Sequence, residues 1–124
     1  MSDTTYVQEF NAVAEALNRY ISGISNADSA VMKPAFSEHA TMFGVKQGKL
    51  SGGAIDILFT NIDTQAEASP LAKAVIVNID IVGTAASARV DSENVSGKFS
   101  YTDFFNLLKL DGNWIIVSKI FYTH

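Results

Sequence analysis

Residues 98–122 read KFSYTDFFNLLKLDGNWIIVSKIFY, and this stretch decides the fold of the chain. The pair Asp111-Gly112 divides it into two alternating apolar segments, Lys98–Leu110 and Asn113–Tyr122. An Asp-Gly pair accepts the positive φ values of a tight hairpin turn. The sequence therefore predicts an antiparallel hairpin closed by a two-residue loop.

The two-residue loop fixes which residues face one another across this hairpin. The expected pairs are Lys109 with Trp114, Leu107 with Ile116, Phe105 with Ser118, and Asp103 with Ile120. One carboxylate, Asp103, then shares a face with apolar side chains, namely Tyr101, Phe105, Leu107, Trp114, Ile116 and Ile120. A charge on an apolar face is costly unless it is paired, protonated or solvated in a cavity. We therefore expect a sheet that lines a pocket around Asp103.

The opposite face of the hairpin is also apolar. It carries Phe104, Leu108, Ile115, Val117 and Phe121. Large bare apolar patches are rare on monomeric proteins. We expect a homodimer through this outer sheet face; the alternative is that the N-terminal segment or a loop covers it.

Composition narrows the class of protein. A length of 124 residues, with 48% hydrophobic residues, predicts one domain over 1–124. The net charge of −4 without a basic run argues against nucleic acid as a partner. The absence of cysteine excludes disulfides and thiol chemistry and favours a cytoplasmic location. No secretory signal is visible around Asp3 and Glu9, and no apolar run is long enough to span a membrane.

The first half of the chain has helical periodicity. Over Thr5–Ile24, apolar residues recur at steps of three and four, which indicates one amphipathic helix, and Thr5 with Gln8 predicts a capping box at its start. Asp28 is a good N-cap for a second helix, which Pro34 should keep short or broken. We further expect a short strand at Thr41–Val45, a turn from Gly44 to Gly48 and a helix at Ala54–Ile62.

The second half alternates with the period of a strand. After a loop at Asp63–Pro70, the segment Lys73–Val82 places Val75, Val77, Ile79 and Ile81 on one face. A turn at Gly83-Thr84 returns the chain through Ala85–Asp91, and Ser92–Gly97 turns it into the final hairpin. Helices followed by an antiparallel meander define the α+β class.

The chain resembles the nuclear-transport-factor-two-like, or cystatin-like, superfamily, and within it the "putative lumazine-binding" and the SnoaL-like (polyketide-cyclase-like) groups. The resemblance rests on three stretches: Tyr20-Ile21-Ser22-Gly23 with Asp28, Ala35-Phe36 running into Ala40–Gly44, and Thr102-Asp103 through Leu107–Trp114 to Lys119. It implies a cone-shaped, curved, mixed or antiparallel sheet wrapped on the N-terminal helices. This fold hosts isomerases, cyclases, dehydratases, binding modules and dimerisation domains, so it does not name a function.

The steroid-isomerase branch of the superfamily uses a tyrosine on the first helix, an aspartate base by the first strand and a protonated aspartic acid on a later strand. By this resemblance Tyr20 matches the tyrosine, and Asp103 lies near the later aspartate. The position of the base reads Phe43-Gly44 instead, which argues against that isomerisation. His39 is an alternative source of a base.

The candidate pocket residues are Tyr20, Met42, Phe59, Asp103, Phe105, Trp114 and Ser118. The candidate catalytic groups are Asp103, as an acid or base, and Tyr20, as an oxyanion donor. Each has an alternative interpretation: Tyr20 as a packed core ring, and Asp103 as a group held by Lys119, a backbone donor or the Tyr20 hydroxyl without any chemistry. We expect His39 on the surface and His124 in a disordered terminus.

No metal or cofactor is expected, because the two histidines lie far apart and the glycines fit no phosphate loop. Three hypotheses remain open. The chain is a binding module for a small aromatic or carbonyl-containing ligand, an isomerase, cyclase or dehydratase that uses Asp103 and Tyr20, or a ligand-free dimerisation domain with a filled interior. An open or a packed interior around Asp103 separates the third hypothesis from the first two.

Overall fold

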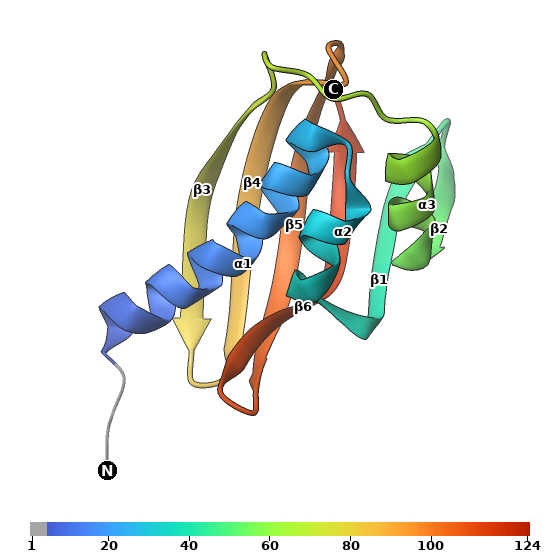
Figure 1. Cartoon of the computed structure of the whole chain (residues 1–124). Helices are drawn as coiled ribbons and strands as arrows, with labels where there is room; N and C mark the ends of the chain where they lie inside the picture. The colour runs from blue at the N-terminus through green and yellow to red at the C-terminus, as the bar shows by residue number, and fades with distance from the viewer. Residues whose placement is uncertain (1–4) are drawn as a thin grey trace.

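A computed structural model describes residues 5–124, so Asp3 lies outside the described residues. Helices cover one face of a curved six-stranded sheet (Figure 1). The helices are α1 (Tyr6–Asn26), α2 (Ser29–Met32), the short 3-10 helix η1 (Lys33–Ala35) and α3 (Asp56–Thr64). The strands are β1 (Phe36–Lys46), β2 (Lys49–Ala54), β3 (Lys73–Val82), β4 (Ala85–Val95), β5 (Phe99–Leu110) and β6 (Asn113–Thr123).

The predicted first helix and its capping box are confirmed. Thr5 accepts a hydrogen bond from the backbone N–H of Gln8, and the Gln8 side chain accepts one from the backbone of Thr5. The two bonds satisfy donors that a helix start leaves unpaired. The stripe buries six residues against the sheet: Val13, Ala16, Leu17, Tyr20, Gly23 and Ile24.

The second helix is short, as predicted. Asp28 caps α2 by accepting from the N–H of Ala30, and the chain then tightens into η1 at Pro34. Proline is tolerated there because the first turn of a helix needs no N–H donor. The third helix, α3, begins at Asp56, two residues later than expected.

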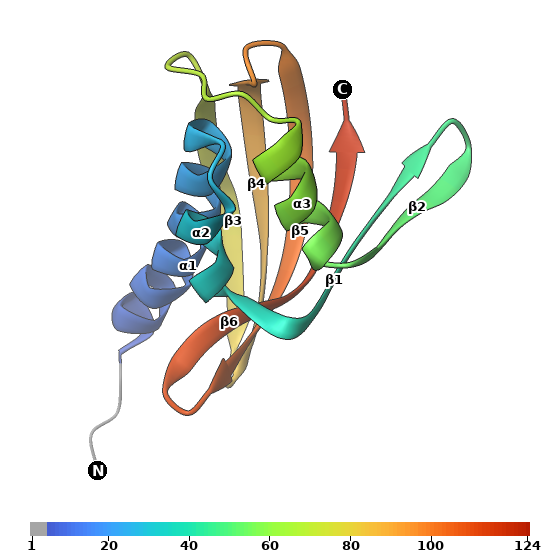
Figure 2. The same cartoon turned by 45° about the vertical axis from the view of Figure 1, so that its right-hand side comes forward.

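The sheet order is β2-β1-β6-β5-β4-β3, and every neighbouring pair is antiparallel except β1 with β6. The predicted meander through β3, β4, β5 and β6 is confirmed, although β4 continues to Val95 in place of the turn expected from Ser92. Asp111 and Gly112 both take positive φ, 51° and 81°, as the tight turn requires. The strand β2 was not predicted; it pairs with β1 through a tight turn at Gln47-Gly48 (Figure 2).

A bulge in β3 corrects one predicted face. The pairing with β4 skips Val77, so Ile76 and Ile79 point to the core. Val75 and Val77 are 57% and 45% exposed, not aligned with Ile79 as simple alternation predicted. An extra residue in a bulged strand changes which face the following side chains take.

A second bulge, in β6, corrects the predicted register of the final hairpin. Lys109 faces Trp114 and Leu107 faces Ile116 as expected, but Val117 has no partner. Phe105 therefore faces Lys119, not Ser118, and Asp103 faces Phe121, not Ile120. Beyond the bulge, Lys119 and Phe121 take the inner face, while Ser118 and Ile120 take the outer one.

The core lies between α1 and the inner face of the sheet, with α3 beside β1 and β2 (Figures 1 and 2). It contains Tyr20, Phe36, Phe105 and Trp114 among aliphatic side chains. In the described part of the chain, no helix has both the length and the apolar character needed to cross a bilayer.

Candidate functional site

Three polar side chains meet inside this core. The Tyr20 hydroxyl donates a hydrogen bond to Asp103 Oδ2 at 2.7 Å, and Lys119 Nζ lies 3.4 Å from Asp103 Oδ1. The residues are 2%, 0% and 5% exposed respectively. Tyr20, Asp103 and Lys119 form what we call the inner cluster.

Each member comes from a different element, which explains why the cluster depends on the tertiary fold. Tyr20 lies on the buried stripe of α1, and its ring packs edge-on against Phe105, with centroids 4.9 Å apart. This packing fixes the direction of the hydroxyl toward β5. Asp103 points inward by strand alternation, whereas Lys119 points inward because the bulge at Val117 changes the phase of β6.

Asp103 is the most unusual of the three. Its Oδ2 is satisfied by Tyr20, but its Oδ1 has no hydrogen-bond donor among residues 5–124. The Lys119 ammonium is close enough for an ion pair at 3.4 Å, yet its geometry does not make a hydrogen bond. Because buried polar atoms are nearly always hydrogen-bonded in proteins, an open acceptor at a buried carboxylate calls for a specific explanation, such as an ordered water, an ion or a functional role.

The protonation of the tyrosines follows from this arrangement. Burial raises the pKa of Tyr20 well above its ordinary value of 10.0, and the charge of Asp103 and the hydrogen bond to it add to the effect. Burial and then Asp103 also raise the pKa of Tyr101. Tyr20 therefore keeps its proton at neutral pH and acts as a hydrogen-bond donor.

Lys119 Nζ lies in largely apolar surroundings. It is 3.6 Å from Met42 Sδ, which its parallel neighbour on β1 supplies, and 5.2 Å and 5.3 Å from the ring centroids of Tyr20 and Phe121. A Cβ at Gly44 would lie only 2.6 Å from Phe121 Cζ, so glycine leaves room for that ring. The Phe121 ring thus occupies the space at the position where the steroid-isomerase resemblance would place a base.

The predicted pocket residues divide into two groups. Met42 and Phe105 contact the inner cluster, and Phe59 reaches it indirectly through Phe36, with ring centroids 5.6 Å apart. Trp114 lies near the β5–β6 turn, where its indole N–H donates to Glu9 of α1.

Ser118 does not face the interior, which corrects the prediction. Its hydroxyl accepts a hydrogen bond from Asn106 on the outer side of the sheet. Lys119 occupies the inner position opposite Phe105 that the sequence analysis assigned to Ser118. Sequence reasoning named Lys119 only as a possible partner of Asp103, because nothing in Ile115-Ile116-Val117 marks a bulge.

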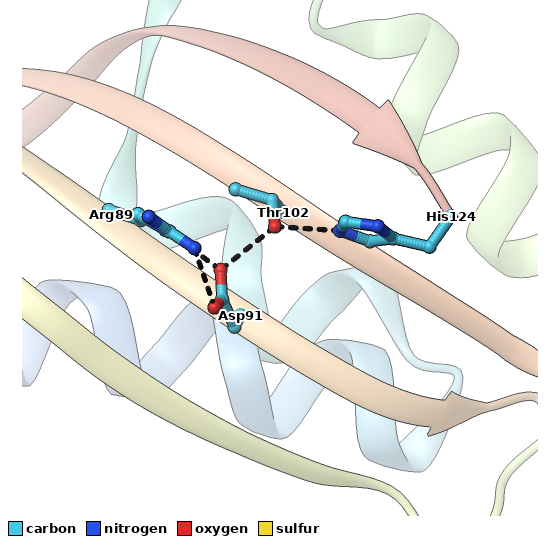
Figure 3. Close-up of polar contacts among 4 residues, drawn as sticks. All are labelled: Arg89, Asp91, Thr102 and His124. Atoms are coloured by element: carbon cyan, nitrogen blue, oxygen red, sulfur yellow. Dashed lines mark hydrogen bonds and ion pairs between the residues drawn. The ribbon is translucent and has the colours of Figure 1, made fainter.

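The two histidines lie away from the inner cluster. His39 is on the surface as predicted, with a side chain 87% exposed beside Glu38. His124 is not disordered: its backbone N–H donates to Ser100, and its ring nitrogen is 2.9 Å from Thr102 Oγ1 (Figure 3).

The structure has two hollows, of which only the smaller is lined by a member of the inner cluster, Tyr20. A cavity of about 10 Å³ lies behind Tyr20 and is lined in part by Ser92, whose buried Oγ has no partner among the described residues; this is room for about one water molecule. A more open polar groove of about 320 Å³ runs along Asp91, Thr102 and His124. Within residues 5–124 no group of three or more His, Cys, Asp or Glu side chains is placed to hold a metal ion.

Comparison with known proteins places the chain in a family. Residues 8–122 match the family described as "Putative lumazine-binding". The chain belongs to this family. It is also 31% identical over 116 residues, 94% of this chain and 92% of the relative, to an aldolase, FrzH, from a Cladobotryum species.

Solved structures agree with this placement. A crystal structure of an NTF2-like protein of unknown function from Shewanella baltica is 57% identical, covers 98% of both chains and superposes with a TM-score of 0.96. A second NTF2-like protein of unknown function, from Methylobacillus flagellatus, is 38% identical over 100% of this chain and 98% of its own, with a TM-score of 0.89. The predicted superfamily and the α+β fold class are confirmed.

Proposed function

We propose that this protein binds a small carbonyl-containing, partly aromatic molecule at the inner cluster. The observation that carries the proposal is the buried Asp103 Oδ1, which has no hydrogen-bond donor among the described residues and lies 3.4 Å from Lys119 Nζ. A ligand carbonyl oxygen would accept from the ammonium, and a neighbouring ligand O–H or N–H would donate to Oδ1. Pockets of this kind are mostly apolar with a few placed polar groups.

The family description is consistent with such a ligand. Lumazine is a bicyclic aromatic ring that carries carbonyl and N–H groups side by side, so it offers the acceptor and the donor that the inner cluster needs. The interior around these groups is packed, because Asp103 is 0% exposed, the Lys119 side chain is 6% exposed, and neither residue lines the two hollows described above. A packed interior is what the third hypothesis predicts, so the binding proposal requires the site to open. Entry therefore requires movement of a neighbouring side chain, and the half-buried Phe121 is the outermost ring in contact with Lys119 Nζ.

The test is a thermal-shift screen of lumazine, flavins, aromatic ketones and keto acids, followed by calorimetry on each compound that raises the melting temperature. A ligand that binds only the folded state stabilises it by mass action, by about 2.7 kcal/mol at a hundredfold excess over Kd. We expect Tyr20→Phe to weaken binding and Asp91→Asn, on the outer face, to leave it unchanged. If no compound stabilises the protein, the third hypothesis of a filled dimerisation domain is favoured instead. If a compound binds Tyr20→Phe and Asp91→Asn equally well, its site lies away from the inner cluster and the proposal is wrong.

A second candidate function is an enzyme that moves a proton next to a carbonyl group. The specific observation in its favour is the likeness to a protein named as an aldolase, together with a carboxylate that has one open acceptor oxygen. Asp103 would take the proton, and the Tyr20 hydroxyl and Lys119 would stabilise the oxygen that gains negative charge. Nuclear magnetic resonance in D₂O separates the two functions, because an enzyme exchanges hydrogen next to the ligand carbonyl and a binding module does not.

We also propose that two copies pair through the outer sheet face. Phe104, Leu108 and Ile120 are 47%, 39% and 55% exposed on adjacent strands, with Ile115 and Val117 half-buried beside them. Ile120 takes the place that the sequence assigned to Phe121. Sedimentation should give a dimer mass for the wild type and a monomer mass for Phe104→Asp; a monomeric wild type would contradict the pairing.

A further inference from the structure

Lys119 differs from the other lysines of the chain in its surroundings. It is 5% exposed, and its Nζ is enclosed by the Tyr20 and Phe121 rings, Met42 Sδ and one carboxylate oxygen. If its task were only to neutralise Asp103, a hydrogen bond between the two would be expected. The 3.4 Å ion pair lacks that geometry, and Asp103 Oδ1 is left as an acceptor.

We propose that Lys119 forms an imine with the carbonyl carbon of its ligand. The inference rests on the proposed function, because it requires a ketone or aldehyde at the inner cluster. Lysine amines form imines with carbonyl compounds once the ammonium has given up a proton, and Asp103 Oδ1, 3.4 Å from Nζ without a hydrogen-bond donor of its own among the described residues, is the acceptor for that proton.

The atoms of this step balance within the cluster and the ligand. The Lys119 ammonium gives a proton to Asp103 Oδ1, 3.4 Å away. The free amine then forms a C–N bond to the carbonyl carbon, and the carbonyl π electrons move to oxygen. The oxygen takes a proton back from Asp103 and another from nitrogen, and it leaves as water when the C=N bond forms. The overall change is ammonium plus ketone to iminium plus water, and Asp103 ends as a carboxylate.

The side chains around Lys119 Nζ also stabilise the positively charged iminium that the step produces. Two aromatic rings lie 5.2 Å and 5.3 Å from Nζ, and a cation near a ring face is stabilised by the ring quadrupole. The Asp103 carboxylate remains beside the iminium, where it can remove a hydrogen from the adjacent carbon. Burial by Met42 and Phe121 limits the water that would hydrolyse the imine.

The experiment is reductive trapping with sodium borohydride in the presence of cyclohexanone, pyruvate or benzaldehyde. Intact mass spectrometry detects the secondary amine, and peptide mapping locates it. We expect the adduct at Lys119 in the wild type and its loss in Lys119→Arg, which keeps the charge but forms no imine under these conditions. Lys46→Arg is the matched control, because Lys46 Nζ lies 5.7 Å from the centroid of the same Phe121 ring, and this variant should keep the adduct at Lys119.

Each outcome decides the question. Labelling that is absent, or no greater at Lys119 than at exposed lysines, overturns the imine, and this reading of the wild type does not depend on any variant folding. If labelling fails while carbonyl compounds still raise the melting temperature, the imine is wrong and the proposed binding function stands. If neither occurs, both are wrong.

Discussion

Two aspartates on neighbouring strands show what the two faces of one sheet do with a carboxylate. Asp91 of β4 lies on the outer face, where Arg89 donates two hydrogen bonds of 3.0 Å and Thr102 donates one of 2.9 Å (Figure 3). Asp103 of β5 follows Thr102 directly and points to the opposite face. It has one hydrogen bond, from Tyr20, and one ion pair.

The difference in burial and hydrogen bonding between Asp91 and Asp103 indicates which of the two is the better candidate for a functional group. Both oxygens of Asp91 are satisfied and its side chain is 35% exposed, so solvent screens its charge and the network holds the surface together. Asp103 is fully buried, and one of its oxygens has no hydrogen-bond donor among the described residues. Such an oxygen lowers the stability of the fold, because it has lost its hydrogen bonds to water. Groups with perturbed, incompletely satisfied surroundings cluster at functional sites.

Among the substitutions that test this comparison, Asp103→Asn should have the largest effect on stability. The substitution leaves the Lys119 ammonium buried without a charged partner, and breaking a buried pair in this way typically costs about 3–5 kcal/mol. Urea unfolding followed by circular dichroism measures the loss. A change below about 1 kcal/mol would mean that the pair is already solvated, as surface pairs are.

Removing both charges should reverse that loss. Asp103→Leu combined with Lys119→Met replaces the pair by apolar side chains, a change that is often neutral or stabilising by about 1–4 kcal/mol. Unfolding of the double variant and both single variants completes a mutant cycle. A double variant clearly less stable than the wild type would show that the buried pair stabilises the fold more than apolar side chains do, and ligand binding should be lost in every case.

Tyr20→Phe should cost less, about 1–3 kcal/mol, because it leaves Asp103 Oδ2 without its donor. The substitution should also change how the stability of the fold depends on pH above neutrality. The pKa of Tyr20 is raised in the folded state, so its contribution is fully present below the ordinary pKa of 10.0 and is lost as the pH rises toward the folded value. Between pH 8 and 12, the free energy of unfolding should fall less steeply with rising pH in Tyr20→Phe than in the wild type. Equal slopes in the two proteins would contradict a contribution of Tyr20 to the pH dependence of stability.

The smallest effect is expected on the outer face. Arg89→Ala should cost less than any of the changes above, and the loss should shrink in high salt, because the pair is exposed and screened by solvent. The hydrogen bond from Arg89 is the main cause that lowers the pKa of Asp91, so its contribution is present above the ordinary 3.8 and lost as the pH falls through the folded value. Melting temperatures between pH 2 and 7 check this, and a salt-independent loss would contradict it.

Much of the fold could be predicted because its signals are local. The capping box at Thr5, the N-cap at Asp28 and the turn at Asp111-Gly112 each depend on residues a few positions apart. The strand β2 was missed because Gly52 and Gly53 interrupt the alternation that marks a strand. Alternation counted from the turn at Asp111-Gly112 correctly placed Asp103 on the inner face of the sheet.

The rest of the inner cluster could not be predicted from alternation. Ile115, Ile116 and Val117 are all apolar, so either face suits each of them and no residue marks where the extra one sits. Without the bulge, Ser118 and Ile120 would line the interior. With it, Lys119 and Phe121 do.

The amino-acid sequence by itself determined the class of fold, the order of its elements and the placement of one acidic group on an apolar face, because periodicity and turn chemistry act over a few residues. Only the tertiary structure decided that a lysine stands beside this group, that one of its oxygens is left open, and that α1 supplies the tyrosine for the other. The reason is physical: a bulge is stable only when the packing of neighbouring strands accepts it, and the three partners are brought together by contacts between residues up to 99 positions apart, from Tyr20 to Lys119.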